Sequence, residues 1–251
     1  NKLAGEKDYF GQYQTLGEIY LNDPDSSNST DYSNYMRVTD IGKAVQTISY
    51  EKNDIEYTRE YFISNPANVM VSKFTASEEG SISRNIYVSS MHGKKNIISD
   101  ANEATITMEG YPTLSGDSSK KEQANGVKFV EHIKIIAEGG TISQGSNHTL
   151  QVKNADSIVM IMSAGTNYQS DPTEGYNYLS DEDAVYDRVV SKVDAAAEKG
   201  YDTLLSEHLA DYKNLYNRCV LNLGATDVPD KMTDDLLHEY NGYNTDEENK
   251  Y

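Results

Sequence analysis

Residues 44–77, AVQTISYEKNDIEYTREYFISNPANVMVSKFTAS, contain the pattern that decides the fold. In the middle of this stretch one face carries Ile55, Tyr57, Arg59, Tyr61 and Ile63, and the other carries Glu56, Thr58, Glu60 and Phe62. A period of two in β-branched and aromatic residues is typical of a half-buried antiparallel strand. A four-residue connection at 51–54 and a turn at 64–68 separate it from its neighbours. We predict three consecutive strands, a structural core that carries no chemistry by itself.

The same alternation continues through the first two thirds of the chain. Residues 81–90 and 104–108 each have apolar side chains on one face. Residues 127–137 are predicted to form a long strand, and glycines punctuate a hairpin-like region at 141–152. Residues 158–162, IVMIM, are continuously apolar, which is typical of a strand buried on both faces. We therefore predict a mainly β fold, a large antiparallel β-sandwich (a supersandwich) with roughly ten strands.

Helical patterns begin at Ser180. We expect Ser180 to cap a helix whose apolar stripe continues to Ala197, with Gly200 ending it. A second apolar stripe covers residues 201–216, a short strand is expected at 220–223, and a third helix at 233–240. We therefore predict two domains. Residues 1–179 form the β-sandwich, and residues 180–251 form a short α-helical linker.

Composition limits the classes of partner. The formal net charge of −18 argues against nucleic acid or an anionic membrane surface, because Lys and Arg drive phosphate binding. No apolar run has the length needed to span a bilayer. Cys219 is the only cysteine, so no intrachain disulfide can form, and we expect it to be a small buried hydrophobic residue.

Metal and catalytic patterns are weak, and no cofactor is expected. Asp23, Asp25 and Ser27 have the spacing that begins a calcium loop, but Asn28 and Asn34 occupy the places that need Gly and Glu. A surface turn is the favoured interpretation, with no metal.

The histidines show no zinc-site spacing. We expect His132 to point to solvent or to a neighbouring loop. His208 and Asp211 share a helix face, where they could hydrogen-bond, and a packing role is favoured over catalysis.

Tyrosines are the candidates for carbohydrate contact, because their rings can stack on pyranose C–H faces. Tyr57 and Tyr61 share a face with isoleucines and are expected in the core. Tyr176 and Tyr178 lie in a loop beside Asn177 and are the predicted sugar-binding residues, with ordinary packing as the alternative.

Several short motifs, in order, resemble the N-terminal β-domain and helical linker of glycoside hydrolase family 95, the α-1,2-L-fucosidases and related α-L-galactosidases. They are YQTLG at 13–17, ISY at 48–50, YTREYF at 57–62, NP at 65–66, YD at 201–202, LL at 204–205, His208, DY at 211–212, Leu215, Arg218 and LNLG at 221–224. The resemblance implies an inverting parent enzyme whose acid and base lie in an (α/α)6 barrel after residue 251. No catalytic residue is therefore assigned to this chain, which is expected to be inactive alone.

The resemblance also implies a partner and a location. The chain would pack against its own catalytic barrel, with glycan as a second candidate partner. It would belong to a secreted bacterial enzyme, extracellular or on the cell surface. Residues 1–5 contain neither an initiator Met nor a signal-peptide core, so a signal peptide is not expected within this chain. A stand-alone carbohydrate-binding module and a complete enzyme are the alternative functions.

Overall fold

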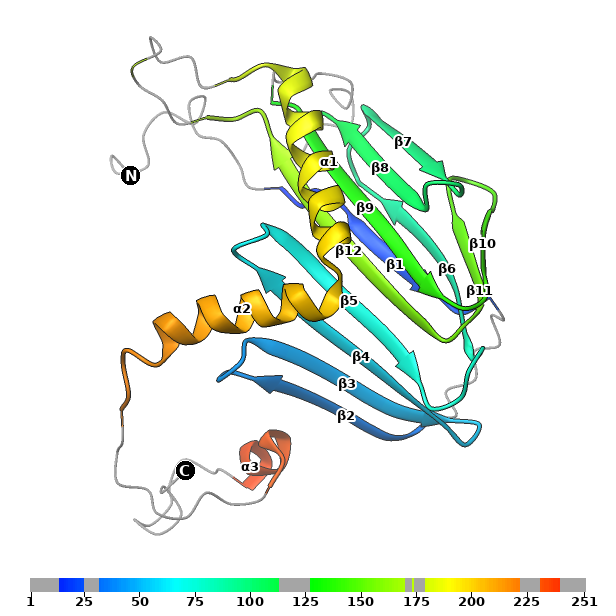
Figure 1. The fold of residues 1–251 in the computed structure, drawn as a ribbon, viewed down its shortest axis with the longest axis vertical. Coiled ribbons are helices and arrows are strands. Elements are labelled where there is room, and N and C mark those ends of the chain that lie inside the picture. The colour runs from blue at the N-terminus through cyan, green and yellow to red at the C-terminus, as the bar shows by residue number, and fades with distance from the viewer. Residues whose placement is uncertain are drawn as a thin grey trace. The chain divides into compact units, whose positions relative to one another are not determined.

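The computed structural model describes residues 14–24, 32–112, 127–169, 173, 179–221 and 231–239. Within them the fold is mainly antiparallel β with two sheets, which confirms the predicted β-sandwich fold (Figure 1). The strands are β1 (Glu18–Asn22), β2 (Ser33–Asp40), β3 (Val45–Lys52), β4 (Ile55–Ser64), β5 (Val69–Ala76), β6 (Ile82–Ser89), β7 (Lys95–Asp100), β8 (Thr105–Gly110), β9 (Phe129–Glu138), β10 (Thr141–Gln144), β11 (Leu150–Ala155) and β12 (Ser157–Thr166).

The helices follow the strands along the chain: α1 (Glu182–Lys199), α2 (Tyr201–Tyr216) and α3 (Thr233–Glu239). The chain forms two compact units, residues 1–213 and residues 214–251. The first unit contains both sheets, α1 and most of α2. The predicted change from strand to helix at residue 180 falls between β12 and α1, and the assignment of the two functional domains stays a prediction.

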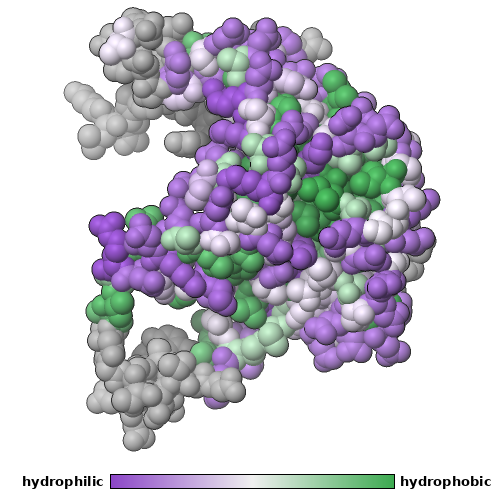
Figure 2. Space-filling model, in the orientation of Figure 1, coloured by the Kyte–Doolittle hydropathy of each residue, from purple (hydrophilic) through white to green (hydrophobic). Residues whose placement is uncertain are grey.

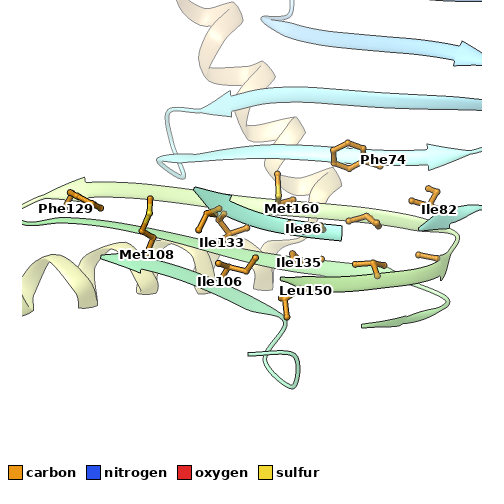
Figure 3. Close-up of a cluster of buried hydrophobic side chains, with 14 residues drawn as sticks. Phe74, Ile82, Ile86, Ile106, Met108, Phe129, Ile133, Ile135, Leu150 and Met160 are labelled. Carbon is orange, nitrogen blue, oxygen red and sulfur yellow. The ribbon is translucent and has the colours of Figure 1, made fainter. Parts of the chain in front are cut away.

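The two sheets differ in width. The larger sheet has the strand order β2-β3-β4-β5-β12-β9-β8-β7, and the smaller has the order β1-β6-β11-β10. Every neighbouring pair is antiparallel. Buried side chains between the sheets form what we call the inner core, including Phe74, Ile86, Ile106, Ile133 and Met160 (Figure 3).

Turn chemistry fixes the register of the predicted meander. The connection between β3 and β4 consists of Asn53 and Asp54 alone, with φ of 56° and 62°. A two-residue turn with two positive φ angles matches the right-handed twist of a hairpin, and Asn and Asp tolerate that conformation. The predicted four-residue connection was therefore too long, because Glu51 and Lys52 continue the β3 ladder.

The larger sheet is buried on both faces around β5 and β12. On β12, Ile158 and Met160 belong to the inner core, while Ile161 belongs to the opposite face, as predicted for residues 158–162. We call this second cluster the helix-side core, and its buried members are Val45, Phe62, Val69, Val71, Ile161, Val193, Ala196 and Leu204. At the end of β4 the two predicted faces differ in burial, since Phe62 is 3% exposed under the helices whereas Ile63, on the opposite face, is 70% exposed.

Both long helices lie on the outer face of the larger sheet (Figure 1). Helix α1 buries Val185, Val189, Val193 and Ala196. Hydrophilic side chains cover much of the exposed side of the helices, and a hydrophobic area lies beside α1 (Figure 2). This amphipathic distribution is what anchors a surface helix to a sheet.

Helix α1 has caps at both ends. Its N-cap is Asp181, whose side chain accepts a hydrogen bond from the Asp183 backbone N–H at 3.0 Å. Ser180, the predicted cap, instead donates its hydroxyl hydrogen to the Asn167 carbonyl at 3.1 Å. Gly200 ends the helix at φ 75°, as predicted.

Two further predictions fail near the C-terminal end of the described chain. Cys219 is exposed rather than buried. Val220 and Leu221 are 86% and 79% exposed and belong to no strand, while residues 222–223 lie outside the described residues. An apolar pattern alone therefore misjudged this segment, because burial depends on a partner surface that the sequence does not identify.

Candidate functional site

The smaller sheet leaves one end of the larger sheet uncovered. Residues of β5, β12, β9 and β8 supply the buried inner core from the larger sheet, and β4 adds the partly buried Tyr57 and Tyr61. Among the described residues, neither β2 nor β3 contributes to it. In Figure 1 these two strands lie at the end of the larger sheet that is farthest from β8 and β7. Within the described ranges, the smaller sheet therefore leaves the inner faces of β2 and β3 open for binding.

A pocket of about 300 Å³ occupies this uncovered surface. Its lining residues, which define the tyrosine pocket, are Asp23, Tyr32, Tyr35, Ile48, Tyr50, Lys52 and Arg59. The antiparallel register places Ile48 opposite Arg59 and Tyr50 opposite Tyr57. Side chains that are paired across neighbouring strands share a face, so these residues all point to the inner side of the sheet.

Tyrosine rings form the wall of the pocket. Tyr32 and Tyr35 are 55% and 53% exposed, and their ring centroids are 6.0 Å apart. Tyr32 meets Tyr50 edge-on at 6.3 Å, and Tyr50 stacks on Tyr57 at 5.3 Å. Rings held by such contacts offer apolar faces with a polar hydroxyl, a surface suited to sugars.

Cationic side chains lie behind and beside the rings. Arg84, only 6% exposed, pairs with Asp23, and the Lys52 ammonium lies 3.4 Å from the same carboxylate. Arg84 and Arg59 both donate to the Tyr50 hydroxyl oxygen, at 3.4 and 3.0 Å. The pocket thus combines an aromatic wall with fixed hydrogen-bond donors, the composition expected of a small-molecule site.

The alternating pattern of the strands alone did not indicate this pocket. Tyr176 and Tyr178, the predicted sugar-binding residues, lie outside the described residues. Tyr57 and Tyr61 pack against the inner core, as expected. The missed signal was the two-residue Asn53-Asp54 turn, because it brings Tyr50 opposite Tyr57 and so gathers tyrosines on one face.

His132 and His208 serve packing. His132 is 5% exposed and its Nδ1 lies 2.7 Å from the Thr107 hydroxyl, so the expected solvent orientation was wrong. Burial lowers the pKa of His132 and favours its neutral form. His208 Nε2 lies 2.9 Å from the Lys43 carbonyl oxygen, and its ring lies 5.0 Å from that of Phe62.

Glu131 is a buried carboxyl group on the inner face of β9. It is 3% exposed, and its Oε2 has no hydrogen-bond partner within the described part of the chain. Removal from water disfavours the charged form and raises its pKa to about 7. A general acid needs such a pKa, but a carboxyl group enclosed between two sheets cannot reach a glycosidic bond.

The described ranges contain neither a metal-binding cluster nor a helix suited to span a membrane. No three His, Cys, Asp or Glu side chains come together there in a way that would hold a metal ion. The Asp23 carboxylate forms ion pairs with Arg84 and Lys52. Asp25, Ser27 and Asn28 lie outside the described ranges. None of the described helices is both long and apolar enough to cross a bilayer.

The fold and the family match identify this chain as a glycoside hydrolase N-terminal domain. Residues 1–171 match the family described as glycosyl hydrolase family 65, N-terminal domain, and the chain belongs to that family. A solved structure titled putative kojibiose phosphorylase from human microbiome shares the fold, with a TM-score of 0.50 and 9% identity. That similarity covers 79% of this chain and 27% of the other.

Curated relatives are fucosidases by name. Alpha-L-fucosidase 2 of Arabidopsis thaliana is 26% identical over 90% of this chain and 27% of its own length. Probable alpha-fucosidase A of Aspergillus niger is 24% identical over 95% of this chain and 29% of its own length. The chain thus spans less than a third of the length of these two relatives.

Proposed function

We propose that this chain is the non-catalytic N-terminal domain of an α-L-fucosidase of glycoside hydrolase family 95, which cleaves α-L-fucosyl linkages with inversion. The observation that carries the proposal is the match to three relatives named as fucosidases over at least 90% of this chain. Each of them is about three times as long or longer, with 27%, 29% and 33% of its length aligned. The remaining length leaves room for a catalytic barrel.

The described carboxyl groups support a non-catalytic role. Inverting glycosidases need two carboxyl groups about 6.5–9.5 Å apart on opposite sides of the scissile bond. Glu131 has the pKa of a general acid but is enclosed in the sandwich. We therefore place the acid and base in the catalytic barrel, against which this domain would pack, and we further propose an extracellular or cell-surface location in a bacterium.

Fucose release from 2′-fucosyllactose tests the proposal. We would compare this chain with a version extended to the length of its curated relatives. We expect release by the extended protein alone, with β-L-fucose as the first product by proton NMR before mutarotation. Turnover by the short chain that persists through a second, different purification would overturn the non-catalytic assignment. Inactivity of both proteins would overturn the proposed fucosyl substrate. Release of α-L-fucose as the first product would overturn the proposed inversion.

A second candidate function is a carbohydrate-binding β-sandwich module, and the tyrosine pocket favours it. The exposed rings of Tyr32 and Tyr35 beside Arg59 and Lys52 provide both stacking surface and hydrogen-bond donors. This function requires no hydrolysis, so binding of a sugar by the isolated chain distinguishes it from the first candidate.

A further inference from the structure

We propose that the tyrosine pocket binds a pyranose that carries an anionic group, a carboxylate or a sulfate, and that Arg59 is its charge partner. The inference rests on the second candidate function, carbohydrate binding, and names its ligand class. It does not depend on fucose release, so a hydrolysis assay and a binding assay can fail separately.

Arg59 is a cation without a counter-charge. Its side chain is half-buried, and its Cζ lies 5.1 Å from the Tyr50 ring centroid and 6.0 Å from that of Phe74. Within the described residues its guanidinium pairs with no carboxylate, and its Nε is buried without a partner. A partly desolvated guanidinium cannot release its proton at neutral pH, so an anion in the pocket would stabilise it strongly.

Positive charge is concentrated here in a strongly acidic chain. The net charge is −18, yet three of the five arginines, Arg37, Arg59 and Arg84, lie on or beside this face. Ile48 pairs with Arg37 on one side and Arg59 on the other, so both guanidinium groups belong to one row across the sheet.

Asp23 does not cancel this charge. It is already shared by Arg84 and Lys52, so Arg37 and Arg59 are in excess among the described groups. In a chain with a net charge of −18, a local excess of cations selects for an anionic ligand.

The size and walls of the pocket fit one sugar ring. A volume of about 300 Å³ lies at the small end of the range for ligand sites. Tyr32 and Tyr35 present exposed rings for the C–H face of a pyranose. Arg59 lies on β4, with β3 between it and β2. A planar guanidinium matches carboxylate and sulfate oxygens in a two-point contact, which a neutral hydroxymethyl group cannot make.

Matched sugar pairs provide the test. We would titrate the 251-residue chain by calorimetry and NMR with methyl β-D-glucuronide against methyl β-D-glucoside, and with D-galactose 6-sulfate against D-galactose. We expect the anionic member of at least one pair to bind about tenfold more tightly, since hydrogen bonds between charged groups have that effect. Its affinity should fall as salt rises, because the contact is electrostatic. The pair that shows the preference separates carboxylate from sulfate.

Three substitutions locate the site. Arg59→Gln should abolish the preference for the anionic sugar, and Arg37→Gln, on the exposed edge strand, should reduce it about two- to threefold without affecting folding. Tyr35→Ala should weaken both members of the preferred pair equally. Arg188→Gln is the charge-matched control, because Arg188 is exposed on α1 and donates to the Thr166 carbonyl.

Three outcomes would overturn the inference. The first is equal affinity for the charged and neutral members of both pairs, and the second is binding by none of the four sugars. The third is an Arg188→Gln effect as large as that of Arg37→Gln, which would show nonspecific attraction. If Arg59→Gln shows no cooperative thermal unfolding and is therefore not folded, the binding of Arg37→Gln and Tyr35→Ala still tests the proposed site.

Discussion

The larger sheet has two halves that share one strand pattern and differ in what covers them. In the covered half, the inner face of β9 carries Phe129, Ile133 and Ile135, all at most 2% exposed. In the open half, the inner face of β3 carries Ile48 and Tyr50, which are only partly buried. The alternation is the same in both, so the second sheet, rather than the strand sequence, determines which half becomes core and which becomes a binding surface.

Each half also contains a charged side chain to which the described residues offer no opposite charge, Glu131 in one and Arg59 in the other, and the two behave differently. Glu131 in the covered half can take up a proton, and burial raises its pKa to about 7. Arg59 in the open half cannot lose its proton in the accessible pH range. The carboxyl group therefore relieves its unfavourable burial by becoming neutral, whereas the guanidinium needs an anion from outside. This difference links the covered half to stability and the open half to binding.

The largest expected effect distinguishes the two halves by packing. Ile133→Ala, at a position with 0% exposure, should lower the free energy of unfolding by about 2–5 kcal/mol, because it leaves a cavity. Ile48→Ala in the open half should lower it by about 1 kcal/mol or less, since solvent already reaches that side chain. Urea denaturation of both variants measures the difference. Equal losses would show that the open half is as tightly packed as the covered half.

A pH series examines Glu131. Its folded pKa is raised from 4.5 to about 7, so the folded state holds the proton more tightly than the unfolded chain. The contribution of Glu131 to stability should therefore be largest below about pH 4.5, fall as pH rises, and level off above about pH 7, with a total loss of up to about 3 kcal/mol. Glu131→Gln should remove this dependence and be the more stable protein at pH 8.

The control for this series is Glu103→Gln, at an exposed position of the same unit. It should leave the slope of stability between pH 4.5 and 7 unchanged. A slope that survives in Glu131→Gln would assign the dependence to other groups.

The smallest expected effect lies in the open half. Tyr35→Ala should change the free energy of unfolding by less than about 0.5 kcal/mol, because the side chain is 53% exposed on an edge strand. Phe74→Ala, its aromatic counterpart in the covered half at 3% exposure, should lower it by about 3–5 kcal/mol. Thermal and urea unfolding of the pair would reveal whether Tyr35 is retained for binding. A large loss in Tyr35→Ala would instead make it a structural residue.

Local patterns predicted the elements well. The meander around β4, the core positions of Tyr57 and Tyr61, the doubly buried β12 and the helix end at Gly200 all follow from period, turn residues or a single glycine. At the end of β4 the alternation indicated the two faces but not their burial, because the helices bury Phe62 on one face and Ile63 on the other stays exposed. The choice between Ser180 and Asp181 as cap depended on Asn167, a partner 13 residues away.

The sequence by itself determined that this chain forms an antiparallel β-sandwich followed by helices, because strand and helix periods and turn residues act over a few positions. Only the tertiary structure decided that His132 is buried, that Cys219 is exposed, and that Tyr35 of β2, Tyr50 of β3 and Arg59 of β4 gather in one pocket. These outcomes depend on register and on which strands the smaller sheet covers. Such contacts join residues far apart in the chain, and a local pattern contains no information about them.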